Sequence, residues 1–123
     1  MTKTAFISGA TSGIGRATAQ RFAKEGLRLI ICGRRIERLQ ELQKELAEHT
    51  EVYSLNFDVR NKSAVQDAVN SLPPEFSAID ILINNAGNAH GLDPIQNGDV
   101  SDWDAMMDIN VKGLLYVTRA LLP

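Results

Sequence analysis

The sequence predicts an α/β fold in which a parallel, doubly wound β-sheet of four strands is flanked by helices. Short runs of apolar and β-branched residues alternate with longer segments in which apolar residues recur at every third or fourth position. Such strand-to-helix alternations follow one another along the whole chain, and parallel strands need crossover helices between them. The first strand also stops at a glycine-rich stretch, after which helical spacing begins.

Two strand-and-helix pairs and a third strand fill the first half of the chain. In the predicted helices, apolar residues recur at three- and four-residue steps among charged residues. Gly26 follows Lys24 and Glu25 at a position where helices commonly end on a glycine. The predicted elements are a strand over residues 4–8, a helix from Ile14 to Gly26, a strand over 27–32, a helix over 36–48 and a strand over 51–57.

The second half adds a helix, a fourth strand, a long loop and a final helix. Pro73 and Pro74 stop the third helix, and a long loop after a strand is a common place for binding residues. Ser101, with Asp104 three residues later, resembles a capping box that would start the last helix. The predicted elements are a helix after residues 58–61, a strand over 79–83, a loop to Val100 and a helix from Ser101 toward Pro123.

Composition excludes several classes of protein. The share of apolar residues is 44% and that of charged residues 23%, which predicts a globular core rather than a disordered chain. Thirteen basic and fifteen acidic residues leave a net charge of −2, so we expect no nucleic-acid partner. We expect no membrane partner, because no apolar run approaches the roughly 18 to 20 residues of a membrane span. A single cysteine and the lack of a signal-type start predict a cytoplasmic protein.

The glycine-rich stretch from Ser8 to Gly15 is the first segment that indicates ligand binding. Glycines permit positive φ angles and close backbone approach, so a pyrophosphate can lie against amides at the start of a helix. The glycine spacing differs from the common G-x-G-x-x-G pattern, and the alternative is a tight strand-to-helix turn without a ligand. The residues expected to contact the cofactor here are Gly9, Thr11, Ser12, Gly13, Ile14 and Gly15.

Four segments resemble motifs of the short-chain dehydrogenase/reductase family. They lie in the family's order, span the whole chain and fall at the element boundaries where the family has them. They are residues 8–15 for TGxxxGxG, with Ser8 in place of Thr; Asp58-Val59 for the aspartate after the third strand; residues 84–87 for NNAG; and residues 110–113 for the segment with the active-site asparagine. The resemblance implies that residues 1–123 form a Rossmann-type NAD(P)-binding domain of an oxidoreductase.

The resemblance also implies roles for residues after the third and fourth strands. Asp58 would accept a hydrogen bond from the adenine amino group, and the Val59 backbone amide would serve the adenine ring. The alternative for Asp58 is an acid that stabilises the start of a helix. Asn84, with the backbone of Ala86 and Gly87, would line the ribose next to the nicotinamide; the alternative is that the asparagines only form a turn.

The residues after the second strand favour NADP(H) over NAD(H). An acidic side chain there would bind the ribose 2′-hydroxyl of NAD and repel a 2′-phosphate, but Gly33 occupies the position. Arg34 and Arg35 follow, and a guanidinium group can grip a phosphate through two hydrogen bonds. The alternative is that both are solvated cations opening a helix. Arg38, one turn further, is expected to be a surface or supporting charge.

The family's reaction moves a hydride between nicotinamide and a carbonyl carbon, while a tyrosine activated by a nearby lysine exchanges a proton with the oxygen. The lysine follows that tyrosine by four residues, but Phe57 and Ala120 stand four residues after Tyr53 and Tyr116. We therefore expect a truncated or incompletely observed oxidoreductase, the alternative being a non-catalytic dinucleotide-binding module. Asn110 is the one member of the active-site group present, and the resemblance implies that it holds a proton-relay water at a helix kink.

Other stretches, residues 33–42 and 58–61 among them, resemble the branch of NADP-dependent 3-hydroxy acid dehydrogenases. This resemblance implies a small hydroxy or carbonyl substrate, such as the 3-hydroxy acids serine and allo-threonine. We also expect a homo-oligomer, with a tetramer favoured, because homotetramers are frequent in the family. His49 and His90 have no metal-ligand spacing with other histidines or with cysteine, so we expect no metal site.

Overall fold

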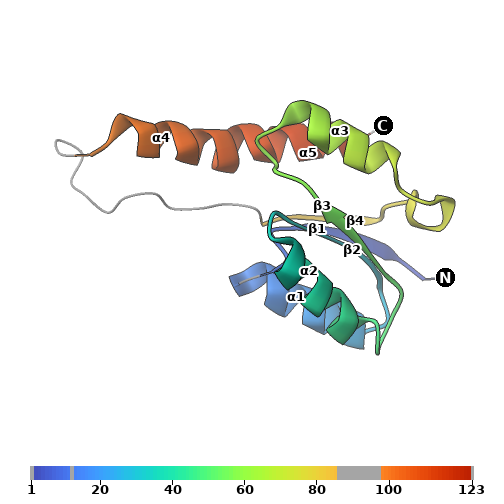
Figure 1. The fold of residues 1–123 in the computed structure, drawn as a ribbon. Helices are drawn as coiled ribbons and strands as arrows, with labels where there is room; N and C mark the ends of the chain where they lie inside the picture. Colours follow the sequence, from blue (N-terminus) through green and yellow to red (C-terminus); the bar gives the residue numbers. More distant parts are fainter. Residues whose placement is uncertain (1, 12, 86–97, 123) are drawn as a thin grey trace.

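The structure, a computed structural model, describes residues 2–11, 13–85 and 98–122 (Figure 1). Four parallel strands form one sheet in the order β3-β2-β1-β4. This arrangement confirms the predicted α/β fold with a parallel sheet. The strands are β1 (Thr4–Ser8), β2 (Arg28–Gly33), β3 (Val52–Asn56) and β4 (Ile81–Asn84).

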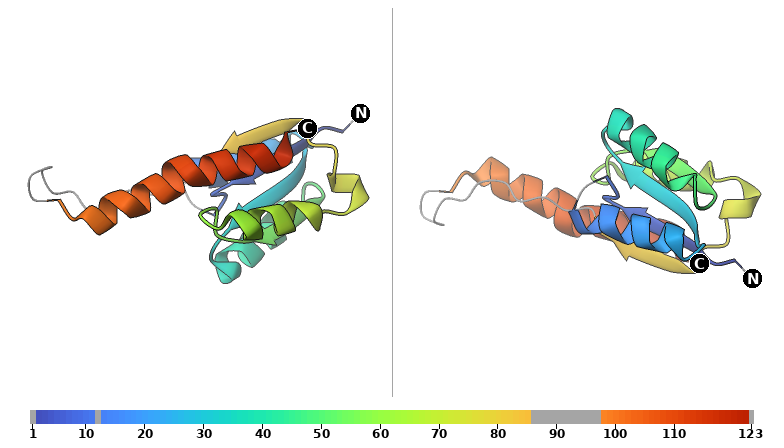
Figure 2. Two further views of the ribbon diagram at one scale, coloured as in Figure 1. Left: turned by 90° about the horizontal axis from the view of Figure 1, so that it is seen from above. Right: turned by 90° about the horizontal axis from the view of Figure 1, so that it is seen from below.

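Helices cover both faces of this sheet, as a doubly wound topology requires. In Figures 1 and 2, α1 and α2 lie on one face, and α3 and α5 lie on the other. The helical elements are α1 (Gly13–Lys24), α2 (Ile36–Leu46), α3 (Lys62–Asn70), the 3₁₀ turn η1 (Pro74–Phe76), α4 (Val100–Met107), the π-helix η3 (Asp108–Gly113) and α5 (Leu114–Leu121).

The two central strands are buried on both faces, which explains their continuous apolar sequences. Ile31 packs with Leu39 and Leu42 of α2, whereas its neighbour Ile30 packs with the opposite cluster that contains Val65 and Val117. Successive side chains of a strand point to opposite faces, and both faces are covered here. The core therefore consists of two layers separated by the sheet.

Helix ends follow the local chemistry of single residues. Gly26 has a φ of 82°, which confirms the predicted end of the first helix. The prediction that Ser101 caps the last helix is wrong. The Asp99 carboxylate accepts hydrogen bonds from the Ser101 backbone N–H at 2.8 Å and from the Ser101 hydroxyl at 2.7 Å, and the helix begins at Val100. Ser101 thus lies inside the first turn, and Asp99 satisfies the exposed amide.

The final helical segment is not a uniform α-helix. The backbone is π-helical from Asp108 to Gly113, between α4 and α5. Figures 1 and 2 show α5 over the sheet beside α3, whereas α4 continues beyond the edge where the strands end. Within the described part of the chain, no helix combines the length and the apolar composition that crossing a membrane requires.

Candidate functional site: the carboxyl edge of the sheet

The predicted binding segments meet at one edge of the sheet because the strands are parallel. Ser8 pairs in register with Asn84, and Gly33 pairs with Asn56, so all four strands end on the same side. The chain leaves β1 toward β2 on one side, and β4 lies on the other side of β1. Ligands of such sheets bind outside the carboxyl ends of the strands, where the direction of winding reverses. Here that point lies between β1 and β4.

The glycine loop connects β1 to the start of α1 at this edge. Gly9 and Gly13 have φ angles of 63° and 57°, in the left-handed region that glycine adopts without strain. The Ala10 N–H donates to the Cys32 carbonyl of β2 at 3.1 Å, which ties the loop to the neighbouring strand. Ile14 lies in the first turn of α1 with 76% of its surface exposed. The loop therefore presents the N-terminus of α1 beside the ends of the strands, the arrangement that binds phosphate groups.

Gly15 is required for a different reason than Gly13. A Cβ atom added at Gly15 would lie 2.3 Å from the Gly9 carbonyl oxygen and 2.5 Å from Nδ2 of Asn85. A Cβ atom added at Gly13 would have no atom within 4 Å. Gly15 thus allows α1 to pack closely against the loop, whereas Gly13 supplies a backbone conformation beside open space.

Asn85 contacts the glycine loop, a role that was not predicted from the sequence. Its Nδ2 donates to the Gly9 carbonyl at 3.1 Å, and its backbone N–H donates to the Ser8 hydroxyl at 3.1 Å. These bonds join the end of β4 to the glycine loop. The sequence signal was available, because a second asparagine directly follows Asn84 at the end of a strand.

Asn84 faces the helical layer. Its Nδ2 donates to the Thr118 hydroxyl of α5 at 2.9 Å, and its buried Oδ1 has no hydrogen-bond partner among the described residues. The structure therefore gives Asn84 a contact with α5, and its predicted ribose contact stays a prediction. Ser12, Ala86 and Gly87 lie outside the described residues.

Arg34 and Arg35 connect β2 to α2. The Asn56 Nδ2 donates to the Gly33 carbonyl at 2.9 Å and to the Arg34 carbonyl at 3.0 Å. Arg35 is the N-cap residue of α2 and makes no side-chain capping bond. A Cβ atom at Gly33 would lie 3.0 Å from the Thr11 side chain, so an acidic residue at this position would crowd the glycine loop.

Asp58 lies at the end of β3 in a cluster of charges. Its carboxylate accepts hydrogen bonds from the Arg60 side chain at 2.6 to 3.1 Å and from the Arg60 N–H at 2.9 Å, and Nη1 of Arg34 lies 3.9 Å away. The Arg60 side chain is the main reason that the pKa of Asp58 is lowered, while partial burial opposes the shift. The next helix, α3, is capped by Asn61, whose side chain accepts from the Ala64 N–H. The Asp58 carboxylate is therefore not the N-cap of α3.

Val59 and Asn110 lie in different elements, the segment after β3 and the π-helix η3. The Val59 side chain is buried in the core with Phe57 and Val65, so only its main chain can serve a ligand at the edge. Asn110 lies within the π-helix η3, so the backbone departs from α-helical geometry at the position where a kink was predicted. Such π-helical segments are frequent at functional sites. The predicted water-binding role of Asn110 stays a prediction.

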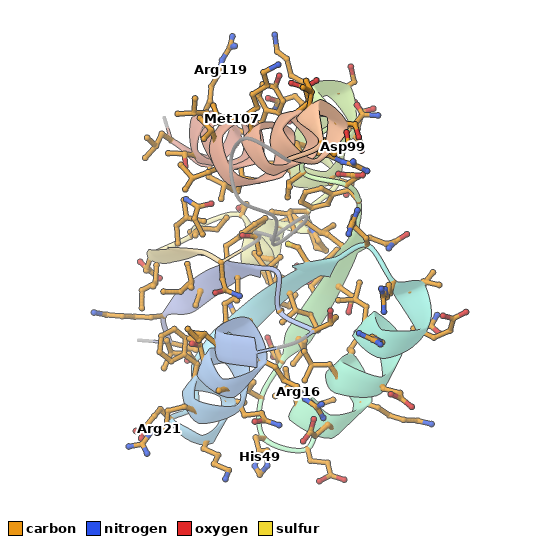
Figure 3. All side chains as sticks on the ribbon, turned by 90° about the vertical axis from the view of Figure 1, so that its left-hand side faces the viewer. Arg16, Arg21, His49, Asp99, Met107 and Arg119 are labelled. Atoms are coloured by element: carbon orange, nitrogen blue, oxygen red, sulfur yellow. The ribbon has the colours of Figure 1, made fainter. Side chains whose placement is uncertain are left out.

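A cleft opens between the glycine loop and α2. It has a volume of about 340 Å³ and is lined by Thr11, Gly13, Arg16, Arg38, Glu41 and Leu42. Figure 3 shows Arg16 between α1 and α2, where its guanidinium lies 3.6 Å from Glu45. Arg16 was not predicted from the sequence, and Arg38 was predicted to be a surface or supporting charge, although both lie near the residues singled out as binding residues. Two arginines and one glutamate thus line the cleft beside the loop.

These features define a dinucleotide-binding domain: a doubly wound parallel sheet with a glycine loop at the point where the winding reverses. The sequence matches the family model described as short chain dehydrogenase over residues 3–123. The chain therefore belongs to the short-chain dehydrogenase family.

Relatives with established names are similar over almost the whole chain. NADP-dependent 3-hydroxy acid dehydrogenase YdfG of Escherichia coli K12 is 48% identical over 117 residues, which are 95% of this chain and 46% of the relative. Sulfoacetaldehyde reductase 2 of Chromohalobacter salexigens is 48% identical over 123 residues, 100% of this chain and 49% of the relative. The chain spans about half the length of these curated relatives.

Solved structures agree with the fold. Serine dehydrogenase from Escherichia coli superposes with a TM-score of 0.90 at 46% identity, covering 98% of this chain and 55% of that one. The closed form of serine dehydrogenase complexed with NADP⁺ gives a TM-score of 0.90 at 47% identity, covering 98% of this chain and 48% of that one. The Rossmann-type architecture is therefore shared with enzymes of known structure.

Proposed function

We propose that the protein is an NADP(H)-dependent oxidoreductase that transfers a hydride between NADP(H) and a small hydroxy or carbonyl compound. The observation that carries this proposal is the turn after β2. There, Gly33 leaves no acidic group to repel a 2′-phosphate, and Arg34 places a guanidinium at the carboxyl edge of the sheet. The names of YdfG and of the serine dehydrogenase complex, both of which include NADP, support it.

The residues at the edge fit such a cofactor. The open space beside Gly13, the cleft lined by Arg16 and Arg38, and the buried Oδ1 of Asn84, which has no hydrogen-bond partner among the described residues, are places where polar groups of a ligand can be accommodated. When bound, NADP(H) supplies or accepts the hydride. The chain's own residues bind and orient it.

Each part of the cofactor has its proposed partners. The backbone of the glycine loop holds the pyrophosphate, Arg34 and Arg35 hold the 2′-phosphate, and Asp58 with the Val59 amide binds adenine. The remaining proposed contacts are those of Thr11, Ser12 and Ile14 beside the pyrophosphate, of Asn84, Ala86 and Gly87 with the nicotinamide-side ribose, and of Asn110 with a proton-relay water.

For the substrate, we propose a 3-hydroxy acid such as serine or allo-threonine. The names of the relatives contain 3-hydroxy acids, serine and sulfoacetaldehyde, all small compounds that carry an acidic group and a hydroxyl or carbonyl group whose carbon can give up or accept a hydride. We also propose a cytoplasmic homo-oligomer, with a tetramer favoured. Large apolar side chains are exposed along α4, η3 and α5, which supports a covered surface there: Val100, Met107, Val111, Leu114 and Leu115.

Steady-state kinetics on the full-length protein test this proposal. Oxidation of serine or allo-threonine with NADP⁺, at a kcat/KM well above that with NAD⁺, is the expected result. Cofactor binding without any turnover of hydroxy acids or of the corresponding carbonyl compounds would instead identify a non-catalytic dinucleotide-binding module. Light scattering on the same sample tests the oligomeric state.

A further inference from the structure

Asn56, the last residue of β3, makes two hydrogen bonds to the turn that carries Arg34. Its Nδ2 group donates to the Gly33 carbonyl at 2.9 Å and to the Arg34 carbonyl at 3.0 Å. The pairing of Gly33 with Asn56 in the sheet places the side chain there. Asn56 is exposed, so the two bonds are not a consequence of core packing.

The two carbonyls belong to the two peptide groups that flank the Cα atom of Arg34. Because peptide groups are planar, fixing the orientation of both also fixes the φ and ψ angles of Arg34 and the direction of its Cα–Cβ bond. One side-chain amide therefore sets the direction in which the Arg34 side chain leaves the backbone.

At the start of α2, the Arg35 carbonyl accepts a hydrogen bond from the Leu39 N–H at 3.0 Å, a contact that does not orient the Arg34 side chain. Arg35 caps α2 without a side-chain hydrogen bond, and Nη1 of Arg34 lies 3.9 Å from the Asp58 carboxylate, beyond hydrogen-bond distance. That carboxylate is engaged by Arg60 at 2.6 Å. The long Arg34 side chain thus depends on its backbone for a preferred direction.

We propose that Asn56 is a positioning residue that holds Arg34 for the 2′-phosphate of NADP(H) and thereby contributes to the preference for NADP(H) over NAD(H). It acts through Arg34 and needs no contact with the cofactor. The inference rests on the proposed function, since it assigns a further residue to the same phosphate contact. If the Arg34 turn adopted the binding conformation only part of the time, the affinity for the 2′-phosphate would fall by that fraction, and the Asn56 bonds prevent this loss by holding the turn.

The test compares two fragments of the cofactor, 2′,5′-ADP and 5′-AMP, which differ only by the 2′-phosphate. Titration calorimetry on the full-length protein gives the ratio of their dissociation constants for wild type, Asn56→Ala, Arg34→Ala and the double variant. In Asn56→Ala, we expect the preference for 2′,5′-ADP to fall by roughly fivefold to tenfold, on the basis of two lost hydrogen bonds. The affinity for 5′-AMP is expected to stay close to that of wild type.

The Arg34→Ala background separates positioning from a general structural role. If Asn56 acts through Arg34, adding Asn56→Ala to Arg34→Ala leaves the ratio unchanged. Ser54→Ala is the matched control on the same strand, because the Ser54 hydroxyl bonds Gln43 at 2.7 Å and not the Arg34 turn. We expect Ser54→Ala to keep the wild-type ratio. Asn56→Val, whose side chain favours strands, is the second variant should alanine weaken β3 itself.

The inference alone is overturned by a wild-type preference for 2′,5′-ADP that survives Asn56→Ala and Asn56→Val, or by an equal loss of affinity for both fragments. A fall in the ratio that persists in the Arg34→Ala background also overturns it, because the effect would not pass through Arg34. A wild-type protein that binds both fragments equally would refute the proposed NADP(H) function itself, and this inference with it.

Discussion

Replacing Gly15 with alanine tests the packing of the glycine loop, separately from any cofactor. The added Cβ would lie 2.3 Å from the Gly9 carbonyl oxygen and 2.5 Å from Nδ2 of Asn85, distances at which one of these groups must move. Moving either weakens the 3.1 Å hydrogen bond between them. An overpacked contact costs about 1 to 3 kcal/mol and a lost hydrogen bond about 1 kcal/mol, and the higher helix propensity of alanine returns somewhat less than 1 kcal/mol. We expect a net loss of about 1 to 3 kcal/mol.

Gly13→Ala is the matched control in the same loop. Its Cβ would meet no atom within 4 Å, so only the positive φ of 57° opposes the substitution, at a cost of about 1 to 2 kcal/mol. Urea unfolding followed by circular dichroism, without cofactor, measures both variants. The larger loss should be that of Gly15→Ala. Equal stability of Gly15→Ala and wild type would refute the close approach of α1 to the loop.

Three further outcomes follow from single contacts. The pKa of Asp58 is lowered in the folded state, so its stabilising contribution is present above its unfolded pKa of about 4 and is lost as the pH falls through the folded value. The difference in unfolding free energy between wild type and Asp58→Asn should therefore shrink in acid. A difference that does not depend on pH would contradict this. Burial raises the pKa of the Cys32 thiol well above its usual value. A disulfide reagent at pH 8 should therefore label Cys32 only when the protein unfolds, and rapid labelling of the native protein would disprove its burial. Thr118→Val removes the hydrogen-bond acceptor of Asn84 Nδ2, and we expect thermal unfolding to show a loss of about 1 to 2 kcal/mol in the free energy of unfolding. Thr118→Ser keeps the hydroxyl and should lose less stability.

The parts of the fold that depend on local pattern could be predicted from the sequence. Consecutive apolar residues such as Ile30 and Ile31 identified a strand that is covered on both faces. Gly26 identified a helix end, because its positive φ is a requirement of the backbone itself. The capping prediction failed because Asp99, two residues earlier, accepts hydrogen bonds from the Ser101 N–H and hydroxyl, so the helix begins before Ser101.

The contacts that build the site depend on which strands are neighbours, and spacing along the chain does not reveal this. Asn85 reaches Gly9 across 76 positions because β4 lies beside β1, and Asn56 reaches Arg34 across 22 positions because β3 lies beside β2. The glycine loop and the arginine pair were found because each is a contiguous motif. The residues that hold these motifs in place were missed because they come from other strands.

The most direct test of the account is the affinity of the full-length protein for NADP⁺ and NAD⁺, measured by titration calorimetry in wild type and in Arg34→Asp. We expect the wild type to bind NADP⁺ more tightly than NAD⁺. Arg34→Asp should weaken NADP⁺ binding by about 1.5 to 3 kcal/mol or more, because a charge-assisted contact is lost and a repulsive charge replaces it, with a smaller effect on NAD⁺. Equal NADP⁺ affinity in wild type and Arg34→Asp would contradict the assignment of the 2′-phosphate to this edge of the sheet.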